Sequence, residues 1–91
     1  MTKKIWQVYL LECMDGSFYT GVTNDMEKRI KAHKEGKGSK YVNLKGYKKL
    51  LVKKKCKSKS QALKEEHKIK QLKKYDKLSY FQNPKPQTQL C

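Results

Sequence analysis

Two tyrosines, an arginine and a histidine in the N-terminal part of the chain have side chains suited to proton transfer and to binding an anion. Tyr9 and Tyr19 flank a short polar segment, and Arg29 and His33 follow at a spacing of one helical turn. A phenol and an imidazole can each give or take a proton, and a guanidinium pairs with anionic oxygens. The four side chains could therefore act as one site if the local folds bring them together.

The segment around the tyrosines predicts a β-hairpin, because an Asp-Gly pair separates two runs of aromatic and β-branched residues. A two-residue loop at Asp15-Gly16 would put Tyr9 and Tyr19 on opposite faces of the sheet. A loop of odd length, such as 15–17, would pair Cys13 with Tyr19 and put both tyrosines on one face. We expect the odd loop, because the residues that follow complete a site. The expected strands are residues 6–13 and 18–23.

A helix is expected over about residues 25–35, ending at Gly36. Its apolar face also carries His33, and Arg29 lies at the edge of that face, so both side chains would point toward the sheet. For a helix considered alone, a histidine at the core edge and a surface arginine is the simpler interpretation. The tyrosine hairpin directly before this helix makes a shared site the better one. The face is formed by Met26, Ile30 and His33.

A second long helix is expected over about residues 60–75, with two glutamates beside its apolar face. An inward carboxylate in a chain dominated by lysine is a candidate ligand for a metal ion. The alternative is a pair of surface glutamates that form weak ion pairs with nearby lysines. Helical periodicity alone does not decide between Glu65 and Glu66. The apolar face is formed by Ala62, Leu63, Ile69 and Leu72.

The stretch from Lys45 to Lys59 contains eight lysines and no acid. Its apolar centre predicts a third strand at the edge of the sheet, where lysines also discourage pairing with other chains. The Gly-rich segment before it predicts a flexible basic loop, in which Lys37 and Lys40 could contact phosphate or simply be solvated. The spacing of glycines in this segment is not that of a nucleotide-binding loop.

A short last helix is expected over about residues 76–81. Residues 1–80 are then expected to form one domain and residues 81–91 a disordered polar tail.

The composition indicates a small basic domain. Of 91 residues, 23 are Lys or Arg and 8 are Asp or Glu, which gives a formal net charge of +15 at pH 7. This charge favours a polyanionic partner, above all a nucleic acid, while no long apolar or membrane-binding segment supports a membrane partner. The three cysteines are widely spaced and form no C-x-x-C pair, which disfavours a cysteine metal site. A reduced cytoplasmic protein, monomeric by default, is the expectation.

Five short motifs, in order, resemble those of the GIY-YIG nuclease domain. The first is Gln7-Val8-Tyr9, which keeps the tyrosine but has Gln where the family name has Gly. The second is Tyr19-Thr20-Gly21, which keeps its Tyr and Gly. The helical arginine of the family matches Arg29, its His-or-Tyr position matches His33, and its metal-binding glutamate matches Glu66. By this analogy, Glu66 is the glutamate of interest.

The resemblance spans Trp6 to Leu78 and is to small stand-alone bacterial members of the family. It implies an α+β fold, a small α/β sandwich with a three-stranded, mainly antiparallel sheet flanked by helices. It also implies a divalent-metal-dependent endonuclease that hydrolyses DNA phosphodiester bonds. The implied cofactor is Mg²⁺ or Mn²⁺, held by Glu66, which suits an ion that keeps several waters.

The resemblance further implies a role for each matched residue. Tyr9 or Tyr19 would take a proton from the attacking water, and Arg29 would pair with the non-bridging phosphate oxygens. His33 would orient a tyrosine or relay a proton, and Gly21 would let backbone and phosphate approach closely. Structural packing is the simpler role for either tyrosine alone, but their joint placement with the other residues favours catalysis.

A nuclease domain without a second, targeting domain is expected to select substrates by structure, cutting single-stranded or branched DNA in repair or recombination. DNA is favoured over RNA, and Tyr41, Tyr47 or Tyr80 could stack on unpaired bases. The main alternative is a non-catalytic basic module that binds nucleic acid and keeps the fold. A ribosome-associated or scaffold protein is a third class, but it has no need of an inward glutamate.

Overall fold

The computed structural model describes residues 5–82 and divides them into three strands and four helices. The strands are β1 (Gln7–Cys13), β2 (Phe18–Thr23) and β3 (Tyr47–Lys55). The helices are α1 (Met26–Lys34), α2 (Lys40–Lys45), α3 (Lys59–Lys70) and α4 (Lys74–Gln82). The expected tail lies outside the described residues except for its first two, residues 81 and 82, which belong to α4.

The strands form one antiparallel sheet in the order β2-β1-β3. The expected α+β sandwich is therefore confirmed, and β3, the lysine-rich strand, lies at an edge as predicted. Successive side chains of the central strand β1 point to opposite faces of the sheet, and side chains on both faces are buried, because a helical layer covers each face.

The hairpin turn has the expected odd length but a different register. The loop is residues 14–16, since the Cys13 amide donates to the Ser17 carbonyl at 2.8 Å. Gly16 has φ +87, which only glycine adopts easily, and the Asp15 carboxylate accepts from the Ser17 amide at 3.0 Å. Tyr19 consequently faces Leu11 rather than Cys13, a shift of two residues that keeps both tyrosines on one face.

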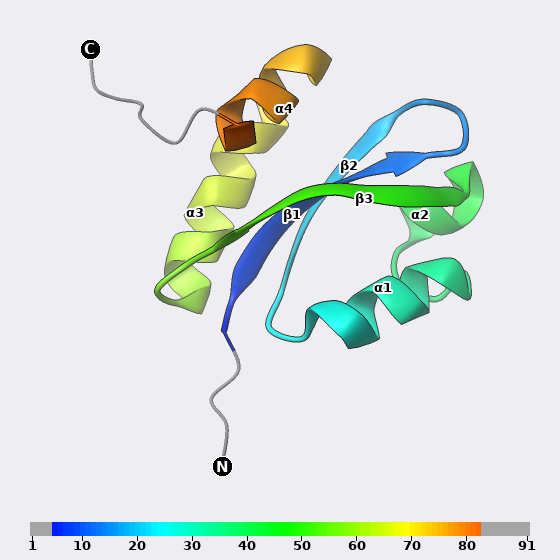
Figure 1. Ribbon diagram of the computed structural model, residues 1–91, viewed down its shortest axis with the longest axis horizontal. Helices are drawn as coiled ribbons and strands as arrows, with labels where there is room; N and C mark the ends of the chain where they lie inside the picture. The colour runs from blue at the N-terminus through cyan, green and yellow to red at the C-terminus, as the bar shows by residue number, and fades with distance from the viewer. Residues whose placement is uncertain (1–4, 83–91) are drawn as a thin grey trace.

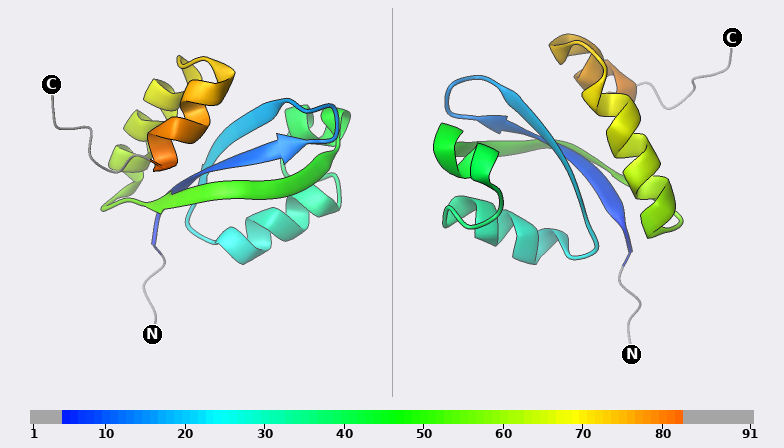
Figure 2. Two further views of the ribbon diagram at one scale, coloured as in Figure 1. Left: turned by 45° about the horizontal axis from the view of Figure 1, so that its top comes forward. Right: turned by 180° about the vertical axis from the view of Figure 1, so that it is seen from behind.

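Two helices cover each face of the sheet (Figures 1 and 2). On one side, α1 and α2 cover a cluster that contains Tyr9, Leu11, Cys13 and Val42. On the other side, α3 and α4 cover a cluster that contains Val8, Cys56, Ala62 and Ile69, with Tyr80 and Phe81 packed against it. The alternation of β1 thus sends Tyr9 into one layer and its neighbour Val8 into the other.

The segment expected to be a flexible loop contains a short helix instead. Ser39 caps α2 by accepting from the Val42 amide at 3.1 Å, and Val42 anchors the helix with an exposure of 1%. Gly46, at φ +87, ends it and returns the chain to β3. One buried residue in a basic segment gives too weak a periodicity for sequence analysis to detect.

The second long helix is shorter than expected. It ends at Lys70, and α4 begins at Lys74, so that Tyr80 and Phe81 turn back onto the apolar cluster around Val8. Leu63 was expected on the buried face but is 43% exposed. No helix among residues 5–82 combines the length and apolar character needed to cross a membrane.

Candidate active site

Tyr9 from β1 and His33 from α1 meet in the layer between the sheet and α1. Tyr9 Oη lies 2.8 Å from His33 Nε2, and the two side chains are 1% and 2% exposed. The Tyr19 ring completes the cluster, with its centroid 6.3 Å from that of Tyr9 and 5.7 Å from that of His33. Three of the side chains singled out from the sequence thus form one group of contacting rings.

Gly21 lies opposite Tyr9 across the β1–β2 ladder. A Cβ atom at this position would lie 2.6 Å from Tyr9 Cζ and 3.0 Å from Tyr19 Cε2, so the Tyr9 ring would have to move to admit it. The absence of a side chain therefore lets the Tyr9 ring lie across β2. In this structure, the close approach that Gly21 permits is that of Tyr9.

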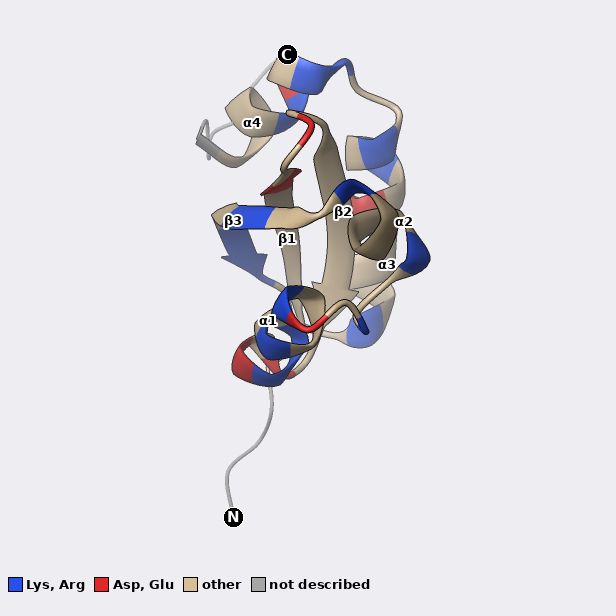
Figure 3. Ribbon diagram, turned by 90° about the vertical axis from the view of Figure 1, so that its right-hand side faces the viewer, with Lys and Arg blue, Asp and Glu red and all other residues tan. Residues whose placement is uncertain are grey.

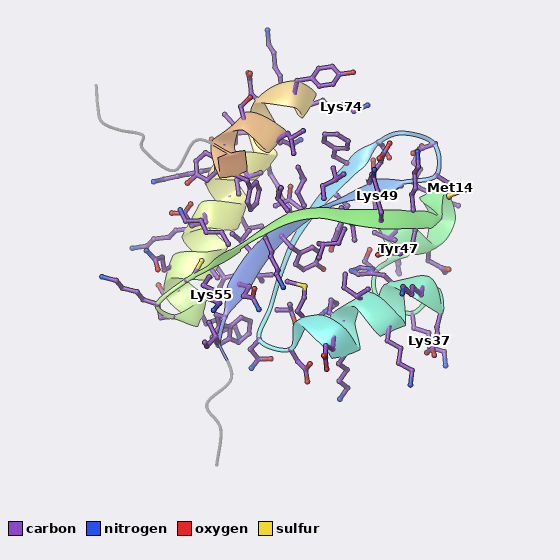
Figure 4. All side chains as sticks on the ribbon, viewed as in Figure 1. Met14, Lys37, Tyr47, Lys49, Lys55 and Lys74 are labelled. Carbon is purple, nitrogen blue, oxygen red and sulfur yellow. The ribbon has the colours of Figure 1, made fainter. Side chains whose placement is uncertain are left out.

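Arg29 and Lys37 line a surface cavity of about 360 Å³ beside α1. Thr23, Lys28 and Gly38 also line it. Arg29 Nη1 donates to the Gly38 carbonyl at 3.2 Å, which fixes the guanidinium at the end of the cavity. Figure 4 places Lys37 beyond the end of α1. Lys40, the other lysine expected to contact substrate, is exposed at the start of α2 and does not line this cavity.

The two glutamates of α3 have different surroundings. Glu65 accepts a hydrogen bond from the Tyr80 hydroxyl and pairs with Lys54 Nζ at 3.4 Å, in the layer formed with α4 and β3. Glu66 pairs with Lys70 at 3.3 Å, one helical turn away, and its charge acts on Tyr9. Its side chain is partly exposed, at 19%. Glu65 therefore ties α3 to α4, whereas Glu66 pairs within α3 and lies within electrostatic reach of Tyr9.

Burial is the main electrostatic influence on the Tyr9–His33 pair. It raises the pKa of Tyr9 well above its usual value, with smaller contributions from Tyr19 and Glu66 and an opposing one from Arg29. Burial, followed by the Arg29 charge, lowers the pKa of His33. At neutral pH both groups are therefore uncharged, and the hydrogen bond between them joins a phenol to a neutral imidazole.

Sequence analysis missed Gly38 as a site residue and did not distinguish Tyr41 from other tyrosines. Tyr41 of α2 stacks on Tyr19, with ring centroids 5.9 Å apart and planes inclined by 26°, and it is 41% exposed.

Tyr80 does not offer a free ring for base stacking, because it packs on the cluster under α3 and α4 and its hydroxyl donates a hydrogen bond to Glu65. Tyr47, the first residue of β3, packs on the cluster around Tyr9 on the other face of the sheet (Figure 4). Ser39, a helix N-cap residue, was the available signal for α2.

The positive charge is spread over several elements. Figure 3 shows Lys and Arg on α1, β3, α3 and α4. On β3, Lys49 and Lys55 are exposed near the two ends of the strand (Figure 4). Such a distribution attracts a polyanion from many directions and does not by itself define a binding track.

The fold and the ring cluster define a small α+β domain with polar groups buried under its first helix. Residues 5–79 match the family model described as the GIY-YIG catalytic domain. The chain belongs to the GIY-YIG family, and its expected membership of this nuclease superfamily is confirmed; a nucleic acid is the substrate that membership implies.

Similar proteins are small bacterial members of the same group. The chain is 45% identical over 75 residues to UPF0213 protein OB0043 of Oceanobacillus iheyensis, covering 82% of this chain and 87% of that protein. The solution NMR structure of UPF0213 protein BH0048 from Bacillus halodurans has a TM-score of 0.53 at 41% identity, covering 84% and 81% of the two chains. That of EF2693 from E. faecalis has a TM-score of 0.63 at 36% identity, covering 89% and 86%.

The donor atoms near the ring cluster suit a hard cation that keeps most of its waters. Within residues 5–82 there is no group of three or more His, Cys, Asp or Glu side chains arranged to hold a metal ion. Glu66 offers a single, partly exposed carboxylate, which is the oxygen ligand Mg²⁺ prefers and enough for an ion that also binds phosphate oxygens. A Zn²⁺-like site would require a closed set of ligands. The residues present thus fit Mg²⁺ or Mn²⁺ held by one glutamate.

Proposed function

We propose that this protein is a divalent-metal-dependent endonuclease that hydrolyses DNA phosphodiester bonds, with selectivity for single-stranded or branched DNA. The observation that carries the proposal is the buried 2.8 Å contact between Tyr9 and His33, made within electrostatic reach of Arg29 and Glu66. Titratable groups with shifted pKa values, gathered beside an arginine and a carboxylate, are typical of catalytic sites. Membership of the family supports the same conclusion.

Each residue of the proposed site has one task in the hydrolysis. The ionised Tyr9 oxygen takes the proton of the attacking water as the water oxygen bonds to phosphorus. The bond from phosphorus to the 3′ oxygen breaks, and this oxygen leaves as an alkoxide whose charge a divalent ion held by Glu66 would stabilise. His33 holds the Tyr9 oxygen in place through their hydrogen bond. Arg29 supplies N–H groups to the non-bridging oxygens, whose charge grows in the transition state. Tyr19 packs beside both rings.

Tyr9 can act as a base only when its phenol is ionised. Burial opposes that ionisation most strongly, Tyr19 adds to the opposition, and the negative charge of Glu66 makes the smallest contribution. Neutralising the Glu66 carboxylate would remove that smallest contribution, and the Arg29 charge already favours the phenolate. A Mg²⁺ or Mn²⁺ ion bound to Glu66 would supply this neutralisation and stabilise charge on the phosphate.

Substrate affinity is proposed to come from the net charge of +15 rather than from base-specific contacts. Binding should then weaken steeply as salt is raised. The exposed Lys37 and Lys40 are the proposed phosphate contacts nearest the α1 end of the site, whereas Gly21 is buried against the Tyr9 ring. A cytoplasmic role in DNA repair or recombination, in a single domain of residues 1–80, is part of the same proposal.

The test is cleavage of labelled single-stranded, duplex and branched DNA with Mg²⁺, Mn²⁺ or a chelator. We expect metal-dependent cutting of the single-stranded and branched substrates, lost in Glu66→Ala and reduced about 10²–10³-fold in Arg29→Ala. Equal cutting of random-sequence duplex would remove the structure selectivity. RNA of the same sequence, cut equally well, would remove the preference for DNA.

Binding measurements on the same variants separate the main alternative. Salt-sensitive binding without cutting of any substrate, unchanged in Glu66→Ala and Arg29→Ala and indifferent to Mg²⁺, would contradict the nuclease. The protein would then be a nucleic-acid-binding module that has kept the fold.

A further inference from the structure

The surface cavity of about 360 Å³ beside α1 is lined by residues from the end of β2, from α1 and from the segment that follows α1. Its described lining contains three basic side chains and a single acid, Asp25. The Asp25 carboxylate also caps α1, since it accepts a hydrogen bond from the Lys28 amide at 3.2 Å. The cavity therefore carries a net positive charge. Its basic side chains are Lys28, Arg29 and Lys37.

The three cations of the cavity have no carboxylate partner within residues 5–82. No ion pair joins Lys28, Arg29 or Lys37 to an acid in that part of the chain. Like charges around one cavity repel each other, and an anion bound among them would relieve that repulsion. The arrangement therefore favours an anionic ligand. The lysines that do pair with acids belong to other elements: Lys45, Lys48, Lys54 and Lys70.

Arg29 connects the cavity to the ring cluster. Its Nη1 atom donates to the Gly38 carbonyl at 3.2 Å, the one acceptor that the described residues supply to it. A guanidinium carries several further N–H donors, which can bind anionic oxygens. The Arg29 charge also lowers the pKa of both Tyr9 and His33, so the guanidinium lies within electrostatic reach of that pair. One side chain thus lines the cavity and acts on the proposed catalytic groups.

Strand β2 makes the same connection. Gly21 lies against the Tyr9 ring, and Thr23, two residues further along, lines the cavity. Residues two apart on a strand point to the same face and are about 7 Å apart. The Thr23 hydroxyl accepts from the Asp25 amide at 3.0 Å, which fixes the turn from β2 into α1. The cavity is therefore a short distance along β2 from the ring cluster.

We propose that this cavity binds a phosphate group of a nucleic-acid backbone, that of the nucleotide next to the scissile phosphate, through Lys28 and Lys37. Arg29 then lies between this phosphate and the one that is cut. The volume of about 360 Å³ lies at the lower end of ligand pockets, about 300–1,000 Å³, so it also admits the attached sugar. The position beside the cut rests on the proposed function, whereas phosphate binding in the cavity does not.

The first test compares two lysines of α1 by their effect on DNA binding in the presence of a chelator. Lys28 lines the cavity, whereas Lys31 lines a separate hollow with Lys34 and Lys53. Lys28→Ala and Lys31→Ala each lower the net charge by one, so long-range attraction falls equally. We expect the log–log slope of oligothymidylate affinity against salt to lose about 0.7 in Lys28→Ala, the share of one phosphate contact, and much less in Lys31→Ala. Fluorescence anisotropy with the full chain measures both slopes.

A charge-preserving variant completes this comparison. Lys28→Arg should keep the wild-type slope, because it keeps a cation at the cavity. An unchanged slope in Lys28→Ala would overturn the proposal, because the cavity would then hold no phosphate of the bound strand. An equal or larger change in Lys31→Ala would also overturn it, because the strand would then be bound by the overall charge or beside Lys31.

Amide NMR of the full chain tests which chemical group the cavity selects. The probes are dTMP and thymidine, which differ only by the phosphate. We expect dTMP to shift the amide signals of residues 23–29 and 37–38, and thymidine to leave them unchanged. The dTMP shifts should be lost in Lys28→Ala and retained in Lys31→Ala. Equal shifts with thymidine, or dTMP shifts only in other segments, would overturn the proposal.

Neither binding measurement requires cleavage, so failure of the cavity and failure of the nuclease are distinguishable. Where the protein cuts DNA, Lys28→Ala should raise KM about tenfold and leave kcat near the wild-type value, because it removes a charged contact to bound substrate. A loss in kcat with KM unchanged would assign Lys28 to the chemical step and overturn its role at the flanking phosphate. Phosphate binding in the cavity without any cutting would support the site and contradict the nuclease.

Discussion

Two tyrosine hydroxyls are held inside this molecule, one in each helical layer. Tyr80 donates to Glu65, whose carboxylate also pairs with Lys54 at 3.4 Å, while the Lys54 ammonium lies 5.4 Å from the Tyr80 ring centroid. This cluster is closed, because each charged group has its partner within it. Tyr9 instead contacts a neutral histidine whose other nitrogen has no hydrogen-bond partner among the described residues.

The difference shows how one fold separates stability from chemistry. Burial raises the pKa of both tyrosines, aided for Tyr80 by its hydrogen bond to Glu65 and for Tyr9 by the Tyr19 charge. The Tyr80 cluster gains nothing from changing its protonation state, since every partner is already satisfied. Tyr9 instead has an uncharged hydrogen-bond partner, and the nearby Arg29 charge favours its phenolate. Paired substitutions in the two layers should therefore have opposite signatures.

The largest contrast is expected between the adjacent glutamates of α3. Glu66→Gln should lower metal-dependent cleavage by about 10³-fold or more with little change in stability, because it removes the proposed ligand. Glu65→Gln should leave cleavage near wild type but lower the unfolding free energy by about 1–3 kcal/mol, because Tyr80 and Lys54 lose a charged acceptor. Single-turnover cleavage and urea denaturation measure the two effects. Equal loss of cleavage in both variants would contradict the assignment of metal binding to Glu66 and of a structural role to Glu65.

The tyrosines provide the next contrast. Tyr9→Phe should lower kcat by about 10²–10³-fold, because it removes the proposed base and leaves the packing in place. Tyr80→Phe should lower stability by about 1 kcal/mol, because Glu65 keeps Lys54 as a partner, and should leave kcat unchanged. If Tyr9→Phe retained full activity while Tyr19→Phe lost it, the general base would be Tyr19.

The sequence predicts the elements of this comparison better than it predicts their contacts. The hairpin, its odd loop, the edge strand and the apolar faces of the helices follow from local periodicity and turn residues, which act over a few positions. The register of Tyr19 and the end of α3 depend on the Asp15–Ser17 turn and on the packing of Tyr80 and Phe81, and so were misplaced.

The site shows the same limit. Helical periodicity leaves Glu65 and Glu66 equivalent, because both border the apolar face, and only the neighbours from other elements distinguish them. The contact of Gly38 with His33 joins a loop to a helix, and its only sequence signal is a glycine in a basic segment. Tertiary contacts of this kind have no periodic signature, so sequence analysis predicts the participants but not their geometry.

Glycines test whether the Tyr9 layer depends on close backbone approach. Gly21→Ala should lower the unfolding free energy by about 1–3 kcal/mol and reduce cleavage, because its Cβ would displace the Tyr9 ring. Gly16→Ala is the matched control: it meets no atom, and it should cost about 1 kcal/mol through its positive φ while leaving cleavage unchanged. Unfolding midpoints and kcat distinguish them. Identical profiles would mean that the close approach of the Tyr9 ring to Gly21 is not needed for cleavage.

The smallest expected effect is the dependence of stability on pH, and it distinguishes the layers by direction. Unfolded His33 takes up a proton near its ordinary pKa of 6.5, whereas the folded ring, whose pKa is lowered, stays neutral. The unfolded state then binds more protons, so stability is lost as pH falls below 6.5, and His33→Gln should reduce this loss. Above pH 10.0 the unfolded tyrosines ionise while Tyr9 and Tyr80 stay protonated, so stability falls as pH rises in both layers. Urea midpoints across both ranges should therefore show an acid limb that depends on His33 and an alkaline limb that either Tyr→Phe substitution reduces. An acid limb unchanged in His33→Gln but reduced in His67→Gln would show that the buried ring is not the group that titrates.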